Sequence, residues 1–143
     1  MTRMLLATIF LFALVLGATV TPAGSVSVTA PWIREAPPNA GMLAAFMSIT
    51  NNAEHTIILR AASSPVFGMI EIHQTKMTNG MAKMTRQDSL PIEPNKTVEL
   101  KPGSYHLMLM KPQRVLRVGD IVKLQLLFDD GETTEVDAVV RRQ

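Results

Sequence analysis

Apolar and polar residues alternate with a period of two along much of this chain, and proline, glycine and asparagine interrupt the alternation at short intervals. This period is typical of β-strands with one buried face. It predicts one strand within each of the segments 25–33, 42–50, 55–63, 97–100, 121–128 and 133–140. We expect the first of these to end at Pro31. No segment after residue 23 combines helix caps with a 3.6-residue period. The prediction is therefore an all-β domain, an antiparallel β-sandwich of eight or nine strands.

Two adjacent strands in the middle of the chain are joined by an Asn79-Gly80 turn. A two-residue type I′ turn needs positive φ at both central positions, and Asn-Gly is the preferred pair. With these residues in the turn, Thr75 lies opposite Met84, and alternation places His73 on the same face. His73 and Met84 are then diagonal neighbours, with Cα atoms roughly 7–8 Å apart.

A second segment, SYHLMLM, covers residues 104–110 and also alternates with a period of two. One face carries His106, Met108 and Met110, and the other carries Tyr105, Leu107 and Leu109. The second set suits a hydrophobic core. The His-x-Met pair is therefore expected to face outward.

The N-terminus has the features of a secretory signal. Arg3 precedes an apolar run over residues 4–17, and small residues follow up to residue 23. The run is short for a transmembrane span, which needs about 20 apolar residues. We therefore predict a signal peptide over 1–23, a domain over 24–143 and a periplasmic location. The domain should have no stable membrane span once the signal is cleaved, although an uncleaved anchor is the alternative. Without cysteine, attachment of a lipid is not expected.

Charge and motifs exclude several classes of protein. The chain has 14 basic and 12 acidic residues, dispersed along its length, and few aromatic residues. Such a balance gives no argument for binding nucleic acid. There is no nucleophile elbow, HExxH motif or phosphate-binding loop. The Glu71-x-His73 pair on one strand face is common by chance, so the chain is predicted not to be an enzyme.

Histidine and methionine are concentrated between residues 73 and 110, which contain two of the three histidines and five of the ten methionines. Cysteine is absent. Thioether sulfur is a soft ligand that selects Cu(I), whereas hard cations prefer oxygen. The pattern therefore indicates a Cu(I) site. A blue-copper electron carrier is excluded because that site requires a cysteine thiolate. The alternative is that these methionines only fill a core or an interface.

The spacing of four of these residues is His-x10-Met-x21-His-x-Met, and PWIREAPPNAGMLAAFMSITN stands upstream. Both features resemble the PCuAC family of periplasmic copper chaperones, and the resemblance covers the chain after residue 24. It implies a cupredoxin-like Greek key fold. It also implies that His73, Met84, His106 and Met108 are the Cu(I) ligands. The implied role is delivery of copper to the CuA centre of cytochrome c oxidase, with oxidase subunit II or another copper-transfer protein as partner.

Some questions stay open at this point. A metal-free periplasmic β-sandwich that binds or assembles other proteins remains the alternative function. Met77, Met81 and Met110 are potential additional ligands. The third histidine, His55, stands at a turn and is expected to lie on the surface outside the site.

Overall fold

The computed structural model describes residues 24–143, so the predicted signal peptide lies outside the described residues. Ten strands form the domain: β1 (Val26–Arg34), β2 (Met42–Asn51), β3 (Ile57–Ser63), β4 (Phe67–Thr78), β5 (Met81–Gln87), β6 (Leu90–Ile92), β7 (Thr97–Leu100), β8 (Tyr105–Pro112), β9 (Ile121–Phe128) and β10 (Thr133–Arg141). Over the described part of the chain there is no helix long and apolar enough to cross a membrane.

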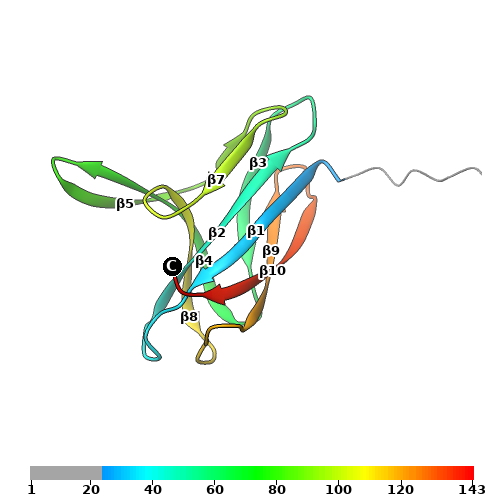
Figure 1. Cartoon of the computed structure of the whole chain (residues 1–143). Coiled ribbons are helices and arrows are strands. Elements are labelled where there is room, and N and C mark those ends of the chain that lie inside the picture. The colour runs from blue at the N-terminus through cyan, green and yellow to red at the C-terminus, as the bar shows by residue number, and fades with distance from the viewer. Residues whose placement is uncertain (1–23) are drawn as a thin grey trace, which may run out of the picture.

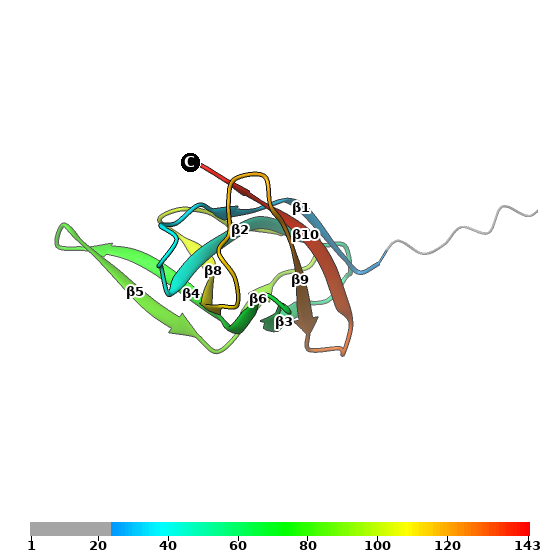
Figure 2. The ribbon, with the colours of Figure 1, turned by 90° about the horizontal axis from the view of Figure 1, so that it is seen from below.

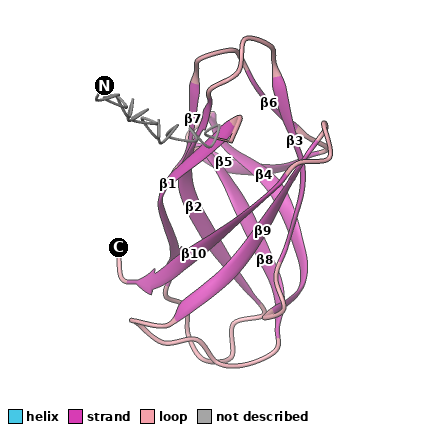
Figure 3. Ribbon diagram, turned by 90° about the vertical axis from the view of Figure 1, so that its right-hand side faces the viewer, coloured by secondary structure: helices cyan, strands magenta, loops and turns pink. Residues whose placement is uncertain are grey.

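The strands are hydrogen-bonded in the order β5-β4-β8-β7-β2-β1-β10-β9-β3-β6, and β2 also pairs with β8. Most pairs are antiparallel; β1 with β10 and β7 with β8 are parallel. The sheet curls over itself, so that β3 near one end contacts β4 near the other. Strands consequently lie on both sides of a common interior (Figure 3). The predicted all-β sandwich is confirmed.

The interior is filled by the apolar residues of the alternating strands. In β9, every second residue is buried, and β10 pairs with it as the predicted hairpin. The largest fully buried side chains are Phe128, Ile33, Ile49, Ile57, Leu59, Ile92, Leu107, Leu109, Leu124, Leu126, Val122 and Val140. Leu107 and Leu109 thus take the core positions that the sequence predicted for them.

Two strand predictions need correction. The first strand does not end at Pro31 but continues to Arg34, because a bulge absorbs the proline: Ala30 has φ of 50° and the pairing with β2 shifts between Thr29 and Trp32. In addition, β6 forms around Pro91, where the sequence analysis predicts no strand. It lies at the edge of the sheet, where the missing N–H donor of proline is tolerated. Beyond the bulge, Trp32 lies opposite Phe46 of β2, and Arg34 lies near His106 of β8.

The β4–β5 hairpin has the predicted register. Asn79 and Gly80 form the turn with φ of 50° and 75°, and Thr75 lies opposite Met84. As the sheet's terminal strand, β5 pairs with β4 alone. The hairpin extends away from the rest of the sheet (Figures 1 and 2), and most of β5 is exposed.

Candidate metal site

The two predicted histidine ligands are direct neighbours across two hydrogen-bonded strands. Strand β8 pairs with β4, and in the register of this pair His73 on β4 stands opposite His106 on β8. The two imidazole ring centroids are 5.9 Å apart, and the ring planes are inclined by 35°. The segments that the sequence analysis treated as separate elements therefore share one surface.

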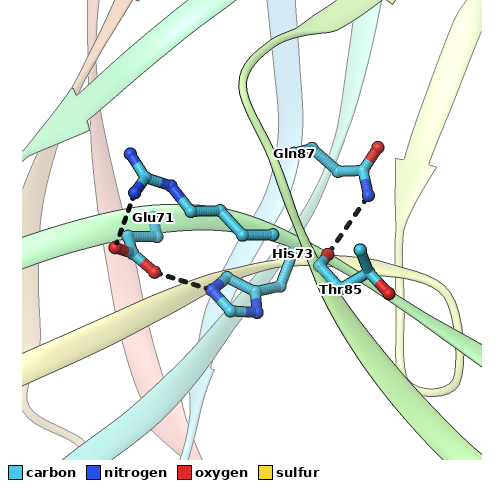
Figure 4. Close-up of polar contacts among 5 residues, drawn as sticks. Glu71, His73, Thr85 and Gln87 are labelled. Atoms are coloured by element: carbon cyan, nitrogen blue, oxygen red, sulfur yellow. Dashed lines mark hydrogen bonds and ion pairs between the residues drawn. The ribbon is translucent and has the colours of Figure 1, made fainter.

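His73 is held by a carboxylate on its own strand. Its Nε2 is 2.8 Å from Oε2 of Glu71 (Figure 4). An ionised carboxylate only accepts hydrogen bonds, so neutral His73 donates through Nε2–H and carries its lone pair on Nδ1. This hydrogen bond is the main cause that lowers the pKa of Glu71, and the charge of Arg86, 3.6 Å away, acts in the same direction.

The other nitrogen of His73 is free for a ligand. Nδ1 is buried and makes no hydrogen bond within residues 24–143. Buried polar atoms are almost always paired, so an orphaned one needs an explanation. Histidines that bind metals usually donate their second N–H to a carboxylate or carbonyl, which fixes the tautomer and the ring orientation. The arrangement of Glu71 and His73 has this form.

His106 is oriented in the same way by a backbone carbonyl. Its Nδ1 lies 3.3 Å from the carbonyl oxygen of Ser104, which leaves the lone pair on Nε2. The ring packs near Phe46 and only 5% of the residue is exposed, so it is far less open to solvent than the prediction of an outward-facing histidine suggested. Burial lowers the pKa of His106, against the opposing effect of the Ser104 hydrogen bond. The neutral form that binds metals is therefore favoured.

The two predicted methionine ligands border a hollow beside His106. The hollow has a volume of about 210 Å³ and is lined by Arg34, Glu35, Ala36, Met42, Leu43, Ala44, Met84, His106 and Met108. Met84 reaches it from the exposed hairpin, and Met108 lies next to His106 on the same face of β8. Three of the four predicted ligands thus surround one space. His73 does not line it but stands opposite His106.

Several residues at this surface were missed by sequence reasoning. Glu71 was dismissed as a chance neighbour of His73, although its spacing was the available signal. Arg34 lies over the ring of Phe46, at 5.3 Å from the ring centroid, and lines the hollow. No sequence signal marks Arg34, because the bulge in β1 brings it there.

Other candidates are not brought to the site. His55 is exposed on the loop before β3, as predicted, and its carbonyl accepts a hydrogen bond from Asn51. Met77 and Met81 lie beside the hairpin turn and are strongly exposed. In residues 24–143 no three His, Cys, Asp or Glu side chains are placed to hold a metal together.

Solved structures share this fold. The copper-bound PCuAC domain from PmoF2 superposes with a TM-score of 0.72 at 22% identity, over 84% of this chain and 95% of that domain. The solution structure of CuI-DR1885 from Deinococcus radiodurans gives a TM-score of 0.66 at 30% identity, over 90% of this chain and 84% of that protein. These matches confirm the predicted cupredoxin-like β-sandwich, which is the PCuAC fold.

Sequence comparison identifies the family. The family model described as "Putative lipoprotein LpqE-like" matches residues 26–140. The "Putative lipoprotein Lxx21020" of Leifsonia xyli subsp. xyli is 32% identical over 120 residues, or 83% of this chain and 71% of that protein. The "Uncharacterized protein RP573" of Rickettsia prowazekii is 33% identical over 120 residues, or 81% of this chain and 66% of that protein.

The chain therefore belongs to the LpqE-like family of PCuAC copper chaperones. This confirms the resemblance inferred from the His/Met motif. The family is not enzymatic, so the prediction that the chain is no enzyme is also confirmed. Its description as a lipoprotein family points to export.

Proposed function

We propose that this protein carries Cu(I) in the periplasm, bound by His73, Met84, His106 and Met108. The observation that supports this is the pairing of His73 with His106. Each imidazole has one nitrogen tied to an oxygen acceptor and the other free, beside thioethers that prefer a soft ion. Such an arrangement is expected of a pair of metal ligands and is unusual for two histidines that only fill space.

The donor set suits a carrier. Four neutral ligands leave Cu(I) with a single positive charge, and no thiolate is available to bind the ion too strongly for release. Met84 is 56% exposed, so a donor from a partner can replace its thioether without unfolding the sheet. Copper is here the cargo, and the protein's residues provide a site that is ordered at the histidines and open at the hairpin.

The recipient that we propose is the CuA centre of cytochrome c oxidase, reached through oxidase subunit II or through another copper-transfer protein. Support for this comes only from the family. The direct test is incubation of the Cu(I)-loaded protein with a soluble subunit II domain, followed by separation and metal analysis of each protein. Copper that stays with the carrier would contradict the proposed recipient.

Competitive titration with a chromogenic Cu(I) chelator tests the site. We expect one tightly held Cu(I) and weaker Zn²⁺ binding, because two of the four donors are thioethers. His73→Ala, Met84→Ala, His106→Ala and Met108→Ala should each weaken binding, and His55→Ala should not. Unchanged binding in all four variants would mean that the ion is held elsewhere. Failure of the unmodified protein to bind Cu(I) at all would favour the metal-free binding or assembly module.

Export through residues 1–23 is part of the same proposal. The measurement is the mass of the protein recovered from the periplasmic fraction after expression of the whole chain. We expect a mass that corresponds to cleavage close to Gly24. An uncleaved chain in the membrane fraction would show that the segment acts as an anchor.

A further inference from the structure

Three methionines outside the predicted ligand set lie in one row across three neighbouring strands. Met110 on β8 is the Cα partner of Met69 on β4 and also the Cα partner of Met42 on β2. None of the three is among the buried core residues, and the core-facing neighbours Leu107 and Leu109 point to the opposite side of β8. The three thioether side chains therefore leave the same face of the sheet.

These methionines are not filling the core. Met42 is 57% exposed and Met69 is 42% exposed, whereas Met47 on the other face of β2 is buried. Met110 between them is partly buried. A methionine that serves only as packing material is usually buried, so this row calls for another role.

The row is placed so that its sulfur atoms can meet. The two outer strands are two strand spacings apart, roughly 9–10 Å, with Met110 midway between them. Methionine has three rotatable bonds beyond Cα, which allows the side chains of Met42 and Met69 to lean over the central one. Three neutral thioethers with no carboxylate among them form a donor set that favours Cu(I) over Zn²⁺, Mg²⁺ or Ca²⁺.

The backbone next to the row is fixed by contacts between the same three strands. Lys111, which follows Met110, has φ of 55°, and its N–H donates to the carbonyl of Gly41, which precedes Met42. Gly68 precedes Met69, and a Cβ there would lie 3.0 Å from Cβ of Lys111. Glycine thus permits a close approach of β4 to β8 at this point. These contacts hold the three methionines in register.

The row adjoins the hollow that holds the predicted ligands. Met42 lines that hollow together with Met84, His106 and Met108. Met110 and Met108 are two residues apart on the same face of β8, about 7 Å along the strand. An ion bound at the row can therefore pass to the His/Met site by exchanging one thioether ligand for that of Met108. This transfer does not change its oxidation state.

We propose that Met42, Met69 and Met110 form a second, thioether-only Cu(I) site beside the His/Met site. It binds more weakly because it lacks imidazole and is more exposed, and it serves as the entry or exit position for the ion. Binding at the row goes beyond the proposed function, since it uses none of the four predicted ligands. Only the entry or exit role rests on that function.

The test is the stoichiometry of Cu(I) binding by the purified protein, in competition with chelators of graded affinity. We expect two ions for the unmodified protein and one for the M42L/M69L/M110L variant, in which leucine preserves apolar volume without sulfur. The matched control is M77L/M81L, which removes two exposed methionines from the hairpin tip and should keep both ions. A row variant that still binds two ions would overturn the proposal.

Variants that lack the two histidines separate this proposal from the function proposed above. H73A/H106A should retain one weakly bound Cu(I), and adding the three row substitutions should remove it. If the unmodified protein binds a single ion that H73A/H106A abolishes and the row variant retains, the row site is wrong and the His/Met site stands. If the single ion is retained in H73A/H106A and lost in the row variant, the row site stands and the His/Met site is wrong.

NMR of the methionine ε-methyl groups tests the proposal on the unmodified protein, so it does not depend on whether the M42L/M69L/M110L variant folds. The unmodified protein is titrated with Ag(I), a soft and redox-stable substitute for Cu(I). After the His/Met site has filled, the methyl signals of Met42, Met69 and Met110 should move together, and those of Met77 and Met81 should stay. Unmoved row signals would show that the row is only an apolar surface strip.

Discussion

The β8 segment and the β4–β5 hairpin each contribute a histidine and a methionine, but they hold them in very different ways. β8 lies inside the sheet, with hydrogen-bonded neighbours on both sides, and His106 is buried. β5 is bonded on one side only, and Met84 is more than half exposed. His73 lies between these extremes, on the hairpin strand β4 but next to β8.

The difference indicates a division of roles. A segment with few buried contacts opens at a lower free-energy cost than one in the core, so β5 should move more readily than β8. The proposed donors on β8 are already held in place by the neighbouring strands, which reduces the ordering that binding requires. We infer that β8 anchors copper and that the hairpin closes over it and releases it.

Removal of both proposed donors from one of these two segments should have the largest effect. H106A/M108A should lower the Cu(I) affinity by at least about 100-fold, and H73A/M84A by less, because the second variant keeps the pre-ordered donors. Competitive chelator titration measures both, with His55→Ala as the control. An equal or greater loss in H73A/M84A would contradict the assignment of β8 as the anchor. Gel filtration would detect copper that bridges two chains in either variant.

The same contrast applies to the stability of the metal-free protein. Leu109→Ala on β8 should lower the free energy of unfolding by about 2–5 kcal/mol, because it leaves a cavity in the core. Met84→Ala on β5 should change it by no more than about 0.5 kcal/mol, as is usual at exposed positions. Urea unfolding followed by circular dichroism gives both values. A large loss for Met84→Ala would mean that the hairpin is as well packed as β8.

Glu71 tests how firmly His73 is oriented. Glu71→Gln should weaken Cu(I) binding by about tenfold or more, within the range that is typical for residues hydrogen-bonded to metal ligands. Glu99→Gln is the matched control, since Glu99 pairs with Lys101 on the surface. Equal affinities for the two variants would show that the contact between Glu71 and His73 does not support the site.

The register of the hairpin should have a smaller effect. Insertion of one glycine between Asn79 and Gly80 shifts β5 by one residue and turns Met84 to the opposite face from His73. We expect a loss of about tenfold in Cu(I) affinity, because one exposed donor leaves while three remain. Stability should change by less than about 1 kcal/mol, since loop tips tolerate insertion. Unchanged affinity and unchanged stability would mean that Met84 reaches the ion from any register.

Regular alternation made much of this fold predictable from the sequence. β9 and β10 follow the period of two over their whole lengths, and Asn79-Gly80 specifies its own turn. The bulge at Ala30 was not predictable, because proline usually ends a strand. Here β1 continues beyond Pro31 because its pairing with β2 resumes at Trp32. The parallel pairs depend on which strands meet in space, which alternation does not encode.

The candidate site was predictable in its residue types but not in its arrangement. The cysteine-free cluster of histidine and methionine indicated a Cu(I) site, and the resemblance to the PCuAC family implied His73, Met84, His106 and Met108 as its ligands. The sequence did not reveal that His73 and His106 stand opposite each other, because this follows from the pairing of β4 with β8. Burial of His106 was also missed, since the residues that cover it, such as Phe46, come from another strand.

The smallest expected effect concerns pH and the burial of His106. Burial lowers the pKa of His106, and the charges of His73 and Arg34 act in the same direction. A lowered pKa means that the imidazole gives up its proton at a lower pH, so its lone pair stays available to copper further into the acid range. The H73A variant isolates this effect, because His106 is then the only histidine at the site, and burial, the largest cause of the shift, remains.

For an imidazole with the ordinary pKa of about 6.5, a change from pH 7.5 to 6.0 reduces the neutral fraction about fourfold. Cu(I) affinity of H73A should fall by less than this over the same interval, because protons compete less well for a buried imidazole. Thioethers do not titrate, so the remaining change reports His106 alone. The measurement is chelator competition, with the chelator calibrated at each pH. A fall of fourfold or more would mean that water reaches His106 freely and that β8 is not more rigid than the β4–β5 hairpin.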